Sequence, residues 1–138
     1  MKKFHLLFAL FAGFLLNTAT AQVNTQYNFG EPFEIGNEKR ASFGKDNFSI
    51  MVAEVMEDSR CPVGINCIWE GLIKLKLNVQ KNDKTYTKEI TMRGSRDATI
   101  EVDGYEIKLL NALSTKTMGL KQYTYTFEVS EAIVTSDK

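Results

Sequence analysis

The sequence contains almost no histidine. Its only one, His5, lies in the first 21 residues, which resemble a removable leader. Residues 22–138 therefore offer no Ser-His-Asp or Cys-His nucleophilic site, and they lack the commonest zinc and copper ligand. We predict no histidine-based catalysis, no metal site and no cofactor.

The sequence also lacks an excess of charge of either sign. It has 17 basic and 17 acidic residues, and loss of the leader with Lys2 and Lys3 leaves two more acids than bases. Nucleic-acid-binding domains favour a basic face, so no nucleic-acid partner is predicted. The composition gives no strong attraction to anionic lipid either. The predicted partner is an envelope protein or a small ligand, whose identity the sequence leaves open.

Only one long apolar run is present. It extends from Phe4 to Leu16, follows Lys2 and Lys3, and precedes the small residues Ala19-Thr20-Ala21. This is the pattern of a secretory signal peptide with cleavage after Ala21, and the run is shorter than the roughly 20 residues of a membrane span. We predict a signal peptide over residues 1–21, export to the periplasm or beyond, and no stable membrane insertion after cleavage. An uncleaved anchor is the alternative.

Helical periodicity is missing throughout, and period-two alternation takes its place. One apolar face alternates with a face rich in Thr, Lys and Glu, which is typical of antiparallel sheets with one wet side. The alternating segments are 48–52, 73–79, 86–92 and 123–129, and the turn pairs Asn82-Asp83 and Asp103-Gly104 separate further strands. We predict an all-β fold, an antiparallel sandwich or open barrel of about seven or eight strands. A loose arm (22–30) precedes a single domain (31–138), and 110–120 is expected to be a loop.

The chain has only two cysteines, and they lie close together. Cys61 and Cys67 are separated by five residues, with Pro62 and Gly64 available to turn the chain. In an oxidising compartment such a pair forms a disulfide. A redox pair normally has two intervening residues and a helix N-terminus, and a zinc site needs four ligands, so both alternatives fit less well.

Four residues around this disulfide are candidates for binding. Trp69, the only tryptophan, either packs as a buried ring that covers the disulfide or caps the end of the sandwich, or it stacks on a ligand at the rim. Arg60 either pairs with neighbouring acids or binds an anionic ligand. Val63 and Ile65 are apolar residues at the tip of the loop, where a partner could contact them.

The segment resembles a family of uncharacterised bacterial secreted proteins and lipoproteins. The resemblance rests on D-S-R-C-P-x4-C-x-W-x-G (residues 58–71) and on G-Y-x-I-x-L (residues 104–109). It implies a small envelope β domain and supports the disulfide, but it supplies no catalytic residue. This chain lacks the cysteine that would carry a lipid anchor.

Together these features favour an exported, non-catalytic binding or structural domain with a disulfide-pinned loop. One alternative is a small hydrolase that uses carboxylates among Glu54, Glu57, Asp58 and Glu70. Another is a protease inhibitor, because a closed loop of fixed shape is what an inhibitor presents.

Overall fold

The computed structural model describes residues 25–62, 64–117 and 120–133, and these form strands and no helix. The predicted signal peptide, residues 1–21, lies outside this part. The strands are β1 (Gln26–Tyr27), β2 (Phe33–Gly36), β3 (Arg40–Phe43), β4 (Ser49–Asp58), β5 (Leu72–Lys81), β6 (Lys84–Arg93), β7 (Ala98–Val102), β8 (Tyr105–Thr117) and β9 (Leu120–Glu131). The all-β prediction is confirmed. No helix in the described part could cross a bilayer.

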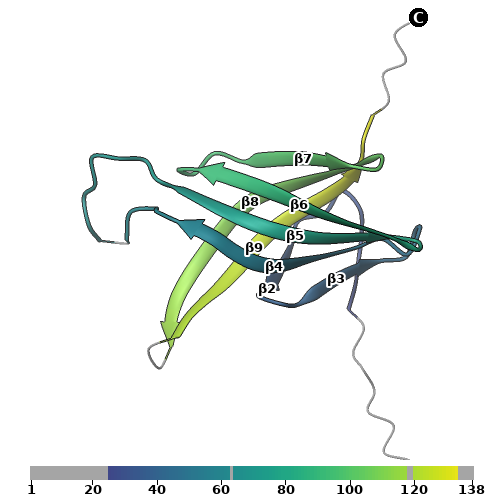
Figure 1. Ribbon diagram of the computed structural model, residues 1–138, viewed down its shortest axis with the longest axis horizontal. Helices are drawn as coiled ribbons and strands as arrows, with labels where there is room; N and C mark the ends of the chain where they lie inside the picture. The colour runs from purple at the N-terminus through teal and green to yellow at the C-terminus, as the bar shows by residue number, and fades with distance from the viewer. Residues whose placement is uncertain (1–24, 63, 118–119, 134–138) are drawn as a thin grey trace, which may run out of the picture.

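The strands form two sheets. One sheet has the order β1-β3-β4-β5-β6 and the other β2-β9-β8-β7. Apart from the short parallel pair of β1 and β3, all neighbours are antiparallel. The chain changes sheet between β1 and β2, between β2 and β3, and between β6 and β7, and the strands β2 to β9 make an up-and-down arrangement folded into two layers (Figure 1).

The core lies between the two layers and comes from the alternating residues. In β5 the inward residues Ile73, Leu75, Leu77 and Val79 are fully buried, while the lysines between them are not. Inward residues of β8 and β9 meet them from the other sheet, and aromatic rings of β2, of β3 and of the residue just before β4 pack at one side. The period-two pattern therefore identified the buried face correctly.

The segment 110–120 is a correction, because it was expected to be a loop. β8 instead continues to Thr117, and its pairing with β9 extends to Thr117 and Leu120. A bulge between Leu109 and Asn111 shifts the register, so the inward series ending at Leu109 resumes at Ala112. The bulge breaks the alternation that marks a strand, so this part of β8 does not show a strand pattern in the sequence.

The arm expected over residues 22–30 is also not loose where the structure describes it. Gln26 and Tyr27 pair with Ser42 and Phe43 of β3. Phe29 stacks on Phe43, with ring centroids 4.7 Å apart. These aromatic contacts cover one side of the core.

The predicted hairpin turn between β7 and β8 is confirmed. Asp103 and Gly104 both have positive φ, 48° and 84°. Two consecutive residues of this kind make the turn whose twist matches that of the flanking strands.

Candidate functional site

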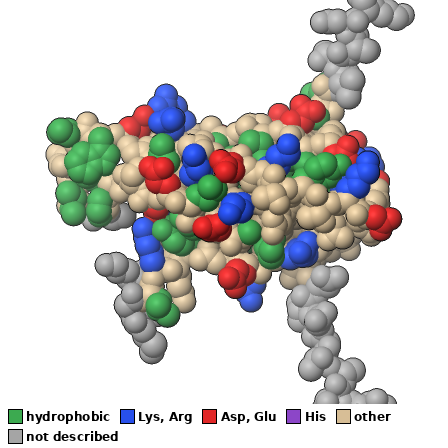
Figure 2. All heavy atoms as spheres, in the orientation of Figure 1, with side chains coloured by type: hydrophobic (Ala, Val, Ile, Leu, Met, Phe, Trp, Pro, Cys, Tyr) green, Lys and Arg blue, Asp and Glu red, His purple; other side chains and the backbone are tan. Residues whose placement is uncertain are grey.

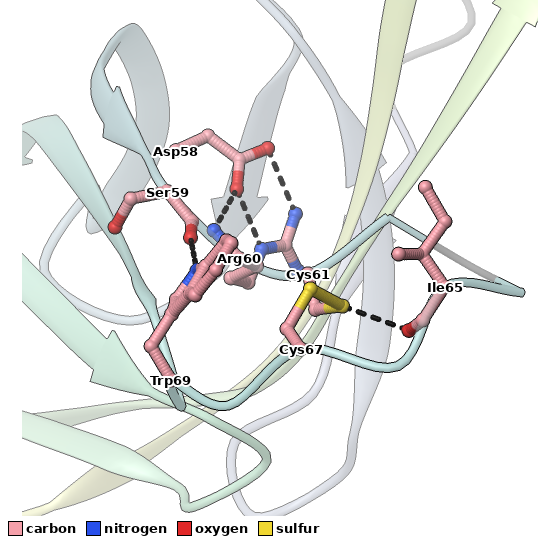
Figure 3. Close-up of a disulfide and its surroundings, with 7 residues drawn as sticks. All are labelled: Asp58, Ser59, Arg60, Cys61, Ile65, Cys67 and Trp69. Atoms are coloured by element: carbon pink, nitrogen blue, oxygen red, sulfur yellow. Dashed lines mark hydrogen bonds and ion pairs between the residues drawn. A yellow bond between two sulfur atoms is a disulfide. The ribbon is translucent and has the colours of Figure 1, made fainter.

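The β4–β5 loop, residues 59–71, projects from one end of the molecule (left in Figure 1). Cys61 and Cys67 form the predicted disulfide, with their Cα atoms 5.9 Å apart. The bond accords with an oxidising compartment. The Cys61 sulfur also lies 2.9 Å from the Ile65 carbonyl oxygen. A disulfide sulfur carries no hydrogen, so this is a close contact and not a hydrogen bond (Figure 3).

Removing the disulfide should lower stability moderately. The chain-entropy model gives about 2.4 kcal/mol for a ring of about seven residues, so Cys61→Ser with Cys67→Ser should lower the free energy of unfolding by about 1–3 kcal/mol. Urea titration measures the change, and wild type in reductant should match the double variant. Intact mass after alkylation should show no free thiol in the folded, unreduced protein. Two alkylated cysteines there would contradict the pairing.

Backbone contacts hold the two ends of the loop together. The N–H of Ser59 donates to the carbonyl of Leu72 (2.9 Å), and the N–H of Leu72 donates to Ser59 Oγ (3.2 Å). Gly71 lies against this junction with φ of 68°, and a Cβ on it would come within 2.4 Å of the Ser59 carbonyl oxygen. The loop is therefore fastened at its base as well as by the disulfide.

Trp69 does not cover the core. Its side chain is 58% exposed, and its indole N–H donates to the Ser59 carbonyl oxygen over 3.2 Å. Figure 3 shows the ring beside the base of the loop. The expectation of a buried ring that caps the sandwich is wrong, because one hydrogen bond at the base fixes the indole and leaves most of it in solvent.

Asp58, the last residue of β4, lies at the centre of a polar cluster that we call the Asp58 network. Arg60 Nε and Nη2 donate to its two carboxylate oxygens over 2.8 and 3.2 Å. Lys121 Nζ (2.8 Å) and the Tyr123 hydroxyl (3.0 Å) donate to Oδ2 from β9. Arg60 Nη1 also donates to the carbonyl of Ala112 in β8. The network therefore joins the loop and the five-stranded sheet to the four-stranded sheet.

The network fixes the charge of Asp58. Burial alone would raise the pKa of this carboxyl, but hydrogen bonds from Arg60, Lys121 and Tyr123 outweigh it and hold the pKa well below its ordinary value. The same carboxylate raises the pKa of Lys121. The Arg60 guanidinium is occupied within the network, so the prediction that Arg60 pairs with a neighbouring acid is confirmed.

A groove of about 820 Å³ lies between the loop and the outer part of the β8–β9 hairpin. It is lined by residues 58, 60–62 and 70, by Met92, by 94–95 in the β6–β7 turn, by 110–115 in β8, and by Lys121. The Asp58 network lies at this boundary. We call the loop (59–71) and the outer hairpin (110–117 and 120–123) together the loop end.

Most large apolar side chains that are exposed in the described residues belong to the loop end. Of seven such residues, Ile65, Ile68 and Trp69 lie in the loop, and Leu113 and Leu120 lie in the hairpin. Apolar side chains gather over the β4–β5 loop at the left of Figure 2. Contiguous exposed apolar surface of this kind marks interaction sites more often than single scattered residues do.

The four predicted binding residues differ in whether a partner can reach them. Ile65 is exposed (62%) and Trp69 is half-exposed, so both are accessible to a partner. Arg60 is held within the Asp58 network. Val63 lies outside the described residues.

The acidic residues considered for a hydrolase are mostly paired with cations. Glu54 pairs with Lys76, and Glu70 pairs with Arg96, both at 2.6 Å. A general acid in glycoside hydrolysis needs a raised pKa, whereas the pKa of Asp58 is lowered. This arrangement does not favour carboxylate catalysis.

Sequence reasoning did not find the hairpin side of the site. Leu113, Lys121 and Tyr123 come more than 40 residues after the loop, and the packing of the two sheets brings them to it. The one available signal in the sequence was the pair Leu113 and Leu120, two apolar residues that flank a mainly polar stretch.

Comparisons of the chain with protein-family models, with curated proteins and with solved structures found no match.

Proposed function

We propose that this protein is an exported, non-catalytic binding domain whose recognition surface is the loop end. The observation that carries the proposal is the exposure of Ile65, Ile68 and Trp69 on one disulfide-closed loop. Ile68 is fully exposed (102%). Each large aliphatic side chain left in water forgoes about 1.5–3 kcal/mol of burial free energy, which a partner could supply.

The construction of the loop supports the proposal. The disulfide, the Ser59–Leu72 hydrogen bonds and the bond from the N–H of Gly94 to the Gly71 carbonyl restrain it in the unbound protein. A loop that is already ordered loses little conformational entropy on binding, so more of the contact energy appears as affinity.

Export is the setting that suits this function. The disulfide fits an oxidising compartment, and the predicted signal peptide would deliver the chain there. The proposed partner is accordingly a protein of the cell envelope or the medium.

Substitution of the exposed isoleucines should separate binding from folding. Ile65→Ser with Ile68→Ser should abolish partner contact and leave the melting temperature unchanged, because these side chains bury little area. Trp69→Ala should lower the unfolding free energy by only about 1 kcal/mol, the value of one hydrogen bond, and should weaken contact. The measurement is photo-crosslinking from a benzophenone side chain at position 66, in the exported protein in intact cells, beside a melting curve.

Ile133 provides the matched control. It is an apolar residue, 89% exposed, beyond the far end of β9 from the hairpin tip. A discrete adduct at position 66 should persist in Ile133→Ser and disappear in the loop variant. An adduct that survives Ile65→Ser with Ile68→Ser, or equal adducts from positions 66 and 133, would contradict recognition by the loop.

A further inference from the structure

One edge of β8 is unpaired where it borders the groove. The ladder between β7 and β8 ends with Ala98 opposite Leu109. On the other side of β8, the ladder with β9 continues from Leu109 to Thr117. Beyond Leu109, β8 therefore has a strand neighbour on one side only among the described residues.

The hydrogen bonds of Ala112 show which backbone groups face the open side. Its carbonyl accepts from Arg60 Nη1, and its N–H donates to Asn111 Oδ1 over 2.9 Å. Both groups thus face away from β9 and are capped by side chains. Backbone groups of a strand alternate between its two sides, so the N–H and carbonyl of Ser114 face the same open side. No side chain of the described residues caps the groups of Ser114.

The free edge of β8 therefore has its backbone groups capped at Ala112 and uncapped at Ser114, the next residue that faces the same side. Capping side chains prevent strand pairing at Ala112, as proteins commonly do along exposed edges. At Ser114 a donor and an acceptor remain at the spacing that an added strand requires. These are the groups that recognise the main chain of an extended polypeptide.

The charges in the groove indicate an uncharged occupant. Asp58 is paired with Arg60 and Lys121, and Glu70 is paired with Arg96. The charged side chains of the lining are thus paired within the protein, and none remains as an unpaired centre for a charged ligand. Leu113, 54% exposed, adds apolar surface beside the edge.

We infer that an extended, uncharged segment of a partner protein adds to β8 as a strand at Ser114. This rests on the proposed function and names the mode of binding at the same site. The segment hydrogen-bonds to Ser114 through its main chain and sets alternate side chains against Leu113 and the loop. The groove admits a single extended chain. The β4–β5 loop forms the wall opposite β8 and leaves no room for the edge of a folded sheet.

The test begins with selection of nine-residue peptides from a random phage-displayed library on the exported, disulfide-bonded protein. Peptides that bind are then synthesised with single backbone N-methyl groups and measured by calorimetry. The Ser114 carbonyl accepts from one peptide N–H, so N-methylation should weaken binding by about tenfold or more at one peptide position and have little effect at the neighbouring positions. Uniform tolerance of N-methylation, or failure to enrich any peptide, overturns the inference.

Two protein variants give an independent result. Ser114→Pro removes the edge N–H without removing a hydrogen bond to β9, a position where proline is tolerated in strands. It should weaken the peptide by about tenfold, and Ser114→Ala, which keeps the N–H, should bind as wild type. Equal binding by both folded variants overturns strand addition. The N-methyl series decides the matter if Ser114→Pro does not fold.

The outcomes distinguish the binding mode from the binding surface. Peptide binding that is lost in Ile65→Ser with Ile68→Ser but insensitive to N-methylation retains the loop end as the surface and rejects strand addition. A concentration-dependent dimer in sedimentation, abolished by Ser114→Pro, assigns the edge to a second copy of the chain and also overturns the inference.

Discussion

Gly71→Ala should lower the free energy of unfolding by about 2–5 kcal/mol. Gly71 has φ of 68°, in the left-handed region that costs residues with a Cβ about 1–2 kcal/mol. The added Cβ would also lie 2.4 Å from the Ser59 carbonyl oxygen and 2.7 Å from the Cα of Arg60. These are backbone atoms, which cannot rotate away, so the base of the loop must separate, at a further cost of about 1–3 kcal/mol.

Gly64 is the matched control for this substitution. It lies in the same loop with φ of 86°, and a Cβ on it would meet no atom within 4 Å. Gly64→Ala should therefore cost only the conformational part, about 1–2 kcal/mol. Urea titration of both variants isolates the steric effect. Equal losses for Gly71→Ala and Gly64→Ala would show that the close approach at the base of the loop is unimportant.

The local pattern predicted most of the fold because alternation directly reports burial. The segments 73–79 and 123–129 each predicted a strand and its inward face. The expectation failed at Leu110, where one bulge reverses the phase for the rest of β8. It also failed for the short strands β1 to β3, since two to four residues carry too few alternations to recognise.

The candidate site was predicted only on its local side. The pair Cys61 and Cys67 could be read from spacing and compartment, and Asp58 with Arg60 from their proximity in sequence. The contacts of Asp58 with Lys121 and Tyr123 span 63 and 65 residues and depend on how the two sheets pack. The exposure of Trp69 likewise depends on a hydrogen bond to Ser59, which composition does not reveal.

The motif at residues 58–71 has a physical basis in this structure. Asp58, Ser59, Cys61, Trp69 and Gly71 all contribute to closing the loop or fastening its base. The exposed residues Ile65 and Ile68 fall at positions that the pattern D-S-R-C-P-x4-C-x-W-x-G leaves unspecified. Apart from Trp69, which both fastens the base and is exposed, the framework and the surface that it presents are made by different residues, so they can be altered separately.

Asp58→Ala should lower the free energy of unfolding by about 2–4 kcal/mol. The Asp58 side chain is only 9% exposed, and it accepts hydrogen bonds from Arg60, Lys121 and Tyr123. Its removal leaves the guanidinium of Arg60, 19% exposed, without its carboxylate partner, and an uncompensated charge of this kind is costly. Lys121 is 45% exposed and recovers part of its loss by solvation.

Glu54→Gln is the control for the loss of a carboxylate in general. Glu54 forms a similarly short ion pair with Lys76, but the two side chains are 56% and 35% exposed. Exposed pairs contribute about 0–1 kcal/mol, so this variant should be close to wild type in stability. A loss as large as that of Asp58→Ala would show that burial of the Asp58 network is not the cause.

The stability that Asp58 provides should also disappear in acid. Because the pKa of Asp58 is lowered in the folded protein, its contribution is complete above the ordinary value of 3.8 and declines as the pH falls below it. In that range the unfolded chain binds a proton that the folded chain does not, at about 1.4 kcal/mol per pH unit. The difference in unfolding free energy between wild type and Asp58→Asn, measured by urea titration from about pH 6 to about pH 2, should therefore be constant at first and then narrow. The other carboxyl groups are present in both proteins, so their effects on the unfolding free energy cancel in this difference. A difference that stays constant to the lowest pH would mean that Asp58 does not remain ionised through contacts of the folded state, and that the charge of the Asp58 network does not hold the loop to the hairpin.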